Sequence, residues 1–110
     1  MKTIEERSYP TWDNDLIMCP SQCYCYFETD DKKYCIYLRW RWSDPWKAQI
    51  VPVDNRCDFI YDDNWEYIDT KFYSHDDYEK LQEECIKIIK EKFNNVKWLV
   101  KEYYGYGNET

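Results

Sequence analysis

Residues 34–46 have the sequence YCIYLRWRWSDPW, in which apolar and polar side chains alternate up to a turn signal. Alternation over several residues is typical of a β-strand whose two faces meet different surroundings. The last four residues, Ser43-Asp44-Pro45-Trp46, fit a tight turn, because proline fixes the backbone angle that such a turn needs. We therefore predict that residues 33–42 form the central strand of an antiparallel sheet and that residues 43–46 turn the chain.

The preceding segment, residues 22–28, alternates in the same way and is separated from the central strand by a polar tip. A two-residue loop at Asp30 and Asp31 pairs the two strands so that apolar residues face apolar residues. The apolar face then contains Cys23, Cys25, Phe27, Tyr34, Ile36, Leu38 and Trp40, with Trp42 at its end. The opposite face contains Tyr24, Tyr26, Lys33, Cys35, Tyr37, Arg39 and Arg41. This alternation does not place Trp46.

The rest of the chain predicts further short strands and one helix. Strands are expected at 47–53, 57–61 and 96–104, and either a strand or a loop at 65–68. Pro52 lacks a backbone donor and therefore marks an edge, an end or a bulge. Ser74 is a good N-cap for an amphipathic helix that runs to about Phe93. The expected fold class is α+β: an antiparallel sheet of four to six strands packed against one long amphipathic helix in the C-terminal half, followed by a last strand.

Length and composition indicate one compact domain over residues 1–110, with 20% aromatic residues to fill its core. We expect residues 1–21 to form an irregular arm, because prolines and polar residues interrupt them, and residues 105–110 to form a frayed tail. No run of about 18 apolar residues is present, which argues against a membrane span. The first residues lack the apolar core of a secretion signal, so we expect a cytoplasmic protein.

Six cysteines stand at positions 19, 23, 25, 35, 57 and 85. In a cytoplasmic chain they are expected to be reduced. Four of them, Cys19, Cys23, Cys25 and Cys35, are enough for a zinc site, but their spacing lacks the C-x2-C knuckle of such sites. Strand alternation also puts Cys35 on the face opposite to Cys23 and Cys25. We therefore predict structural thiols, no metal and no cofactor.

The single histidine, His75, stands at the expected helix start beside Asp76 and Asp77. No serine lies in the glycine-containing elbow of a hydrolase, since both glycines are in the tail. We interpret His75 as an exposed residue of the helix terminus. The prediction is a non-enzymatic protein without catalytic residues.

Charge is the clearest indication of function. The net charge is −7, and residues 54–84 contain eleven acidic and three basic residues, a net of −8. A surface this negative repels nucleic acids and anionic membranes and favours a basic protein partner. Exposed rings within the block would anchor such a partner. The residues expected to bind it are Asp58, Asp62, Asp63, Trp65, Glu66, Tyr67, Asp69, Asp76 and Asp77.

In size, charge and composition the chain is similar in general style to two kinds of inhibitor. These are the phage-encoded inhibitors of bacterial defence nucleases, such as anti-CRISPR proteins, and the immunity proteins that neutralise toxins. The similarity implies that the chain imitates nucleic-acid charge and blocks a nuclease or another nucleic-acid-binding enzyme. It rests on no shared motif and therefore transfers no residues.

An alternative is a small-ligand or nucleotide-binding domain. Its site would be the sheet face that carries Tyr24, Tyr26, Tyr37, Arg39 and Arg41. Arginine forks suit phosphate or carboxylate groups, and tyrosine rings suit a planar base.

Overall fold

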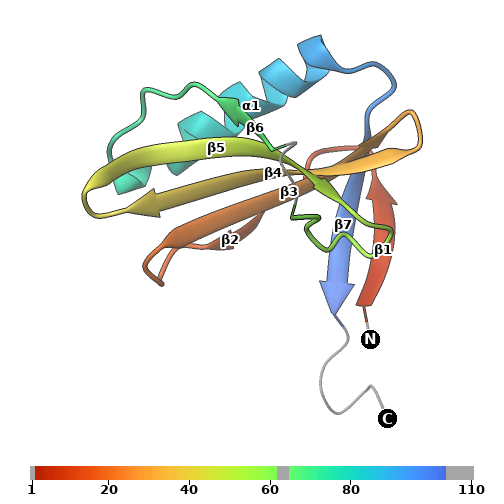
Figure 1. The fold of residues 1–110 in the computed structure, drawn as a ribbon, viewed down its shortest axis with the longest axis horizontal. Coiled ribbons are helices and arrows are strands. Elements are labelled where there is room, and N and C mark those ends of the chain that lie inside the picture. Colours follow the sequence, from red (N-terminus) through yellow and green to blue (C-terminus); the bar gives the residue numbers. More distant parts are fainter. Residues whose placement is uncertain (1, 62–64, 104–110) are drawn as a thin grey trace.

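The computed structural model describes residues 2–61 and 65–103, which form a seven-stranded antiparallel sheet and one long helix (Figure 1). The strands are β1 (Lys2–Arg7), β2 (Asp13–Asp15), β3 (Ser21–Thr29), β4 (Lys32–Arg41), β5 (Asp44–Val53), β6 (Glu66–Ile68) and β7 (Lys97–Tyr103). A 3-10 turn, His75–Asp77, leads into helix α1 (Tyr78–Lys92). The sheet order is β1-β7-β3-β4-β5-β6, and β2 pairs with β3 outside this path. The predicted α+β class is confirmed.

The hairpin of β3 and β4 forms in the predicted register. Cys23 pairs with Leu38, Cys25 with Ile36 and Phe27 with Tyr34. Its tip is the two-residue loop, in which Asp30 has a φ of 49° and Asp31 a φ of 64°. Two successive positive φ angles match the right-handed twist of the flanking strands, which explains why so short a loop can close the hairpin.

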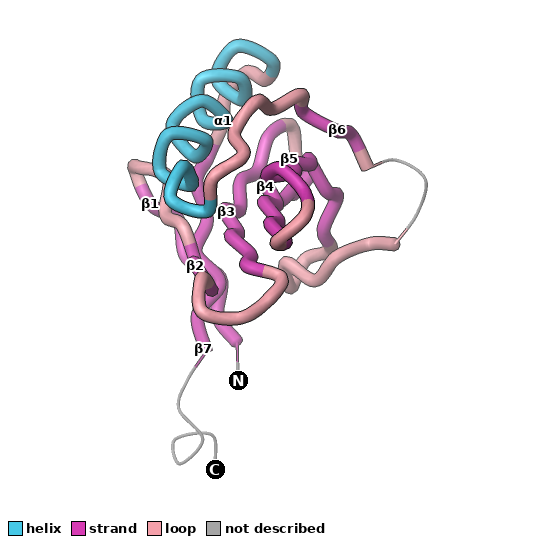
Figure 2. Tube along the Cα trace, turned by 90° about the vertical axis from the view of Figure 1, so that its left-hand side faces the viewer, coloured by secondary structure: helices cyan, strands magenta, loops and turns pink. Residues whose placement is uncertain are grey.

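The first face of the sheet packs against α1, which lies across it (Figures 1 and 2). From the helix, Leu81, Cys85 and Ile89 are almost completely buried. They meet apolar side chains of the central strands and of β7. These sheet residues are Cys23, Cys25, Phe27, Ile36, Leu38, Trp40, Trp46, Ala48, Ile50 and Trp98. We call this side of the sheet the helix face.

The second face of the sheet also carries a core. Its buried residues are Tyr26, Cys35, Tyr37, Val51, Val53, Cys57 and Leu99. The segment that follows β5 covers them, and Phe59 and Trp65 of this segment pack against the cluster. We call this side the loop face. Both faces are therefore packed, and a sheet of this kind buries more apolar surface than one with a solvated face.

The expectation of an irregular arm over residues 1–21 is wrong for two segments. Strand β1 pairs with β7 along its whole length, from Lys2 opposite Tyr103 to Arg7 opposite Trp98. Strand β2 pairs with β3, and Asn14 Oδ1 accepts a hydrogen bond of 2.8 Å from Gln82 of the helix. Charged residues are common in edge strands, where they discourage pairing with other chains. The polar sequence of β1 therefore does not look like a strand, although it forms one.

The turn predicted at residues 43–46 lies elsewhere. The chain turns at Trp42 and Ser43, so that Arg41 pairs with Asp44 and Pro45 belongs to β5. As a result Trp42 is 82% exposed and not a core residue. An irregularity between Arg39 and Arg41 inserts one extra residue into β5 and turns Trp46 into the helix face, where it is fully buried.

The strand predicted at residues 57–61 is also wrong. Only a single bridge, between Val53 and Phe59, forms there. The side chain of Asp54 accepts hydrogen bonds from the backbone N–H of Arg56 (2.8 Å) and of Asp58 (3.0 Å), which bends the segment over the sheet.

The remaining predicted elements form. Residues 65–68 contribute the short strand β6, and the last strand begins one residue later than expected. The Ser74 side chain accepts a hydrogen bond from the Asp76 N–H, as expected for an N-cap. Pro52 lies one residue before the end of β5 and beyond the reach of β6, and its carbonyl oxygen accepts a hydrogen bond of 3.0 Å from the Ile60 N–H. The tail at 105–110 lies outside the described residues.

Candidate interaction surface

The acidic residues predicted to bind a partner lie in separate regions. Asp58 Oδ1 accepts a hydrogen bond of 2.8 Å from Lys101 Nζ on the loop face. Glu66 forms an ion pair with Lys92, the last residue of α1. Asp76 and Asp77 precede the other end of this helix, and its 15 residues span about 22 Å at 1.5 Å per residue. Glu66 and Asp76 therefore belong to opposite ends of the molecule.

The other members of the predicted set differ in exposure. Trp65 is partly buried, and its Nε1 donates a hydrogen bond of 2.8 Å to the Ile60 carbonyl oxygen. Its ring stacks edge-on against Phe59, so Trp65 holds the covering segment in place. Tyr67 and Asp69 are exposed. Asp62 and Asp63 lie outside the described residues. The structure thus does not assemble the predicted set into one continuous surface.

The tyrosines of the alternative ligand face are closed off. Tyr26 and Tyr37 are buried, and the Phe59 ring lies 5.4 Å from the ring of Tyr37 and 6.0 Å from that of Tyr24. The Tyr24 hydroxyl donates to Gln22 Oε1, and Gln22 Nε2 donates to the Tyr37 oxygen. Burial raises the pKa of Tyr24 to about 12 and also raises that of Tyr37. The other two predicted residues are less enclosed: Arg41 is exposed and Arg39 is partly buried.

Three loops meet at the end of the sheet where β4 turns into β5, on the left of Figure 1. The imidazole of His75 connects two of them, since its Nε2 lies 2.9 Å from Ser21 Oγ and 3.2 Å from the Leu16 carbonyl oxygen. The Trp40 ring packs edge-on against His75, and its Nε1 donates to the Tyr73 carbonyl oxygen at 3.1 Å. We call the residues 16–20, 42–43 and 72–76 the three-loop end.

Trp46, which the alternation did not place, completes this cluster. Its Nε1 donates a hydrogen bond of 2.9 Å to the Ser74 carbonyl oxygen. Its backbone N–H donates to the Phe72 carbonyl oxygen, also at 2.9 Å. The two buried indoles therefore hold the segment before α1 against the sheet, and the three-loop end has a fixed base.

The outer surface of the three-loop end is apolar. Ile17 is 96% exposed, Trp42 82%, Tyr73 69% and Met18 62%. These are four of the eight exposed large apolar side chains in the described part of the chain. A concentration of this kind marks an interaction site more often than scattered exposure does. The sequence does not reveal this surface, because alternation places Trp42 in the core and because Ile17 and Met18 belong to residues 1–21, which are expected to form an irregular arm.

Carboxylates border this apolar surface. Asp15 directly precedes the first loop, Asp44 follows the second, and Asp76 belongs to the third; all three are exposed. Arg41 and Lys71 are cations on the same flanking segments. The arrangement is an apolar centre with a polar rim, which is the usual anatomy of a protein interface.

The Ser21, His75 and Asp76 side chains have the order of a catalytic triad but not its geometry. Nε2 of His75 lies 3.2 Å from the Leu16 carbonyl oxygen, which only accepts, and this contact favours the tautomer with the proton on Nε2, in which the imidazole does not take a proton from Ser21. Ser21 is 2% exposed, and its hydroxyl also lies 3.0 Å from the Met18 carbonyl oxygen. Nδ1 lies 3.8 Å from Asp76 Oδ1, beyond hydrogen-bonding distance. The expected exposed histidine is therefore a half-buried structural one.

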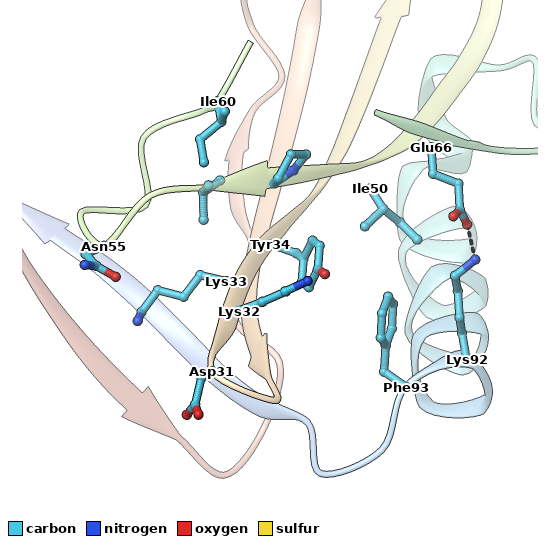
Figure 3. Close-up of a pocket in the computed structure, with 12 residues that line it drawn as sticks. Asp31, Lys32, Lys33, Tyr34, Ile50, Asn55, Ile60, Glu66, Lys92 and Phe93 are labelled. Atoms are coloured by element: carbon cyan, nitrogen blue, oxygen red, sulfur yellow. Dashed lines mark hydrogen bonds and ion pairs between the residues drawn. The ribbon is translucent and has the colours of Figure 1, made fainter. Parts of the chain in front are cut away.

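A surface cavity of about 570 Å³ opens at the other end of α1 (Figure 3). Tyr34, Ile50 and Phe93 contribute apolar side chains to its lining. Of its three lysines, Lys92 pairs with Glu66 and Lys33 with Glu28, at 3.6 Å in the second case. Two of its three lysines are therefore already ion-paired, and its described lining contains no cysteine, serine or histidine.

The cysteines are not assembled into a metal site. Cys23 and Cys25 lie in the core of the helix face, Cys35 in the core of the loop face, and Cys19 at the surface. Burial raises the pKa of Cys23 and Cys25 to about 12, which disfavours the thiolate that a metal needs. Among residues 2–61 and 65–103, no three His, Cys, Asp or Glu side chains are grouped to hold an ion.

No family model, curated protein or solved structure matches this chain. In the described ranges, no helix has the length and apolar character needed to cross a membrane.

Proposed function

We propose that this chain is an acidic, non-enzymatic interaction protein that binds a basic surface of a protein partner through its three-loop end. The observation that carries the proposal is the gathering of Ile17, Met18, Trp42 and Tyr73 above a fixed base of indoles. Exposed tryptophan and tyrosine are the side chains most often found as energetic anchors of interfaces. They are preorganised here, because Trp42 packs against the buried Trp40 with ring centroids 5.3 Å apart.

Charge supports the choice of partner. The net charge of −7 steers a basic protein toward the chain over long distances, and the carboxylates around the three-loop end act at contact. Asp76 and Asp77 of the predicted acidic set lie beside this surface, whereas Asp58 and Glu66 are already ion-paired elsewhere. A basic surface of this kind is typical of nucleic-acid-binding enzymes, so the chain would act by occupying the site where the nucleic acid binds. Phage-encoded inhibitors of defence nucleases and toxin-neutralising immunity proteins act in this general manner.

Matched charge reversals test the proposal. Asp15→Lys with Asp76→Lys changes the rim of the three-loop end, and Glu83→Lys with Glu91→Lys changes exposed positions on α1. Each reversal adds two units, so both pairs bring the net charge from −7 to −3. Wild type and variants are immobilised through the C-terminus, because the end of β7 lies away from the three-loop end in Figure 1. They are then exposed to lysate of the cells that express the chain.

We expect wild type and the α1 pair to retain a basic protein that the rim pair loses. With the purified partner, the rim pair should bind at least about tenfold more weakly, roughly 1.4 kcal/mol, and the α1 pair within about threefold of wild type. Circular dichroism establishes that the variants are folded. Equal losses in both pairs would mean that only total charge matters, and retention of no basic protein by wild type would contradict the proposal outright.

A further inference from the structure

A second charged site lies on the hairpin of β4 and β5, next to the three-loop end, whose bordering residues Arg41 and Asp44 also line this site. Arg39, Arg41, Asp44, Pro45 and Lys47 line a pocket of about 240 Å³. Three of these five residues are cations, in a protein whose net charge is −7. Arg39 and Lys47 are direct cross-strand partners, so their side chains leave the same face of the sheet.

The pairing of Arg39 with Lys47 is unfavourable by itself. Like charges directly opposite each other destabilise an antiparallel pair. Within the described ranges, none of the three cations forms an ion pair with a carboxylate, although Lys33, Lys92 and Lys101 all do. Arg39 Nε is buried and has no hydrogen-bond partner there. The fold thus holds three positive charges together with one carboxylate, that of Asp44, in the lining of the same pocket.

The irregularity in β5 gives this pocket its shape. Arg41 pairs with Asp44 and Arg39 with Lys47. Two residues along β4 are therefore matched by three residues along β5, which is a β-bulge with one extra residue in β5. Such a bulge increases the local twist and re-aims side chains, and bulges are frequent beside functional sites. Here it brings Asp44 and Pro45 to the pocket beside the three cations.

We propose that Arg39, Arg41 and Lys47 bind the phosphate group of a small molecule. Because Arg39 Nε is buried, the guanidinium can offer only its terminal Nη groups to the pocket, and these can donate to oxygens of a tetrahedral anion. Lys47 adds a point charge on the same face. Asp44 can accept a hydrogen bond from the P–OH of a singly protonated phosphate, whereas sulfate has no such hydrogen at neutral pH. The pocket is therefore expected to prefer phosphate to sulfate.

This ligand is a phosphate group and not a base-stacked nucleotide. The rings that would stack a base, Tyr26 and Tyr37, are buried on the same face. Phe59 covers Tyr37, so a base cannot lie flat against it. Recognition is expected to stop at the phosphate group and the atoms next to it.

Titration with inorganic phosphate, followed by heteronuclear NMR at constant ionic strength, tests the site. We expect the amide signals of residues 39–47 to shift with phosphate and to shift less with sulfate. Lys47→Gln and Arg41→Gln should each weaken phosphate binding roughly fivefold or more, and Arg56→Gln, at an exposed position outside the pocket, should not. Phosphoethanolamine distinguishes the source: equal binding indicates a phosphate ester, and weaker binding indicates free phosphate.

Thermal unfolding gives a second readout. In phosphate-free buffer Lys47→Gln should unfold at the same temperature as wild type or higher, because the repulsion from Arg39 is relieved. Phosphate should raise the unfolding temperature of wild type more than that of Lys47→Gln, because the variant binds phosphate more weakly. The proposal is wrong if residues 39–47 do not respond to about 10 mM phosphate. It is equally wrong if sulfate binds as well as phosphate, or if Lys47→Gln lowers the unfolding temperature in phosphate-free buffer.

Discussion

Five of the six thiols are buried residues of the two cores, and each of them is a small apolar side chain in this setting. Burial raises the pKa of Cys23, Cys25 and Cys85 to about 12 and that of Cys57 to about 11, against an ordinary 9.0. Nearby lysines, chiefly Lys101, limit the rise at Cys57. The folded chain therefore keeps protons on these sulfurs at a pH where the unfolded chain has lost them.

Alkaline pH should unfold the protein steeply. Because the folded pKa values lie above the unfolded ones, the thiols' contribution to stability is complete below pH 9 and is lost between pH 9 and about 12. Each thiol should lower the free energy of unfolding by about 1.4 kcal/mol per pH unit in this window. Urea titrations from pH 8 to 11 measure this slope. Replacing Cys23 by Ala should reduce this slope. An unchanged slope would contradict the conclusion that the buried thiols cause the loss of stability.

At the scale of elements, α1 stabilises the sheet through a narrow stripe of side chains. Leu81, Cys85 and Ile89 are buried, whereas the neighbouring Ile88 is only partly buried. Ile88 and Ile89 are the same residue type at adjacent positions of one helix. Substituting each in turn therefore measures the contribution of packing while the change in helix propensity stays the same.

Ile89→Ala should lower the free energy of unfolding by about 2–5 kcal/mol, the usual cost of a cavity in a core. Ile88→Ala makes the same chemical change at a partly buried position and should cost about 1 kcal/mol or less. Chemical denaturation of both variants provides the comparison. Similar losses at the two positions would show that α1 does not dock as described.

Elements with a strong local pattern could be predicted from the sequence, and elements held by distant partners could not. The β3–β4 register follows from alternation and an even loop, and the helix follows from Ser74 and an apolar stripe. Strand β1, with the sequence KTIEER, has little strand character and exists through its pairing with β7 some 90 residues away. Strand β2, with the sequence DND, depends likewise on β3.

The candidate surface was harder to predict than the fold. The alternating pattern places Trp42 in the strand and on its apolar face. In the structure the turn already begins at Trp42, so this side chain leaves the sheet. No local pattern reveals that residues 16–20 and 72–76 meet at the end of the β4–β5 hairpin, since the side-chain hydrogen bonds that join these segments cross 28 to 59 residues. An Ile-Met pair before Cys19-Pro20 was the one available signal, as an apolar step in an otherwise polar stretch.

At the scale of the whole molecule, charge and apolar exposure are segregated. The exposed apolar side chains Ile17, Met18, Trp42 and Tyr73 share one end, whereas Tyr61 and Tyr67 are exposed elsewhere. The cations Arg39, Arg41 and Lys47 line a pocket with Asp44 and Pro45, next to this end. The two proposed sites are therefore neighbouring surfaces that share Arg41 and Asp44.

Two pairs of equally exposed rings allow the most direct test of the central claim. Trp42 and Tyr73 are 82% and 69% exposed at the three-loop end, and Tyr61 and Tyr67 are 82% and 69% exposed outside it. Isothermal titration of the purified partner should show that Trp42→Ala with Tyr73→Ala weakens binding by about a hundredfold, roughly 2.7 kcal/mol. Tyr61→Ala with Tyr67→Ala should leave the affinity within about threefold of wild type. The opposite pattern, loss with the Tyr61 and Tyr67 pair and retention with the Trp42 and Tyr73 pair, would contradict the account.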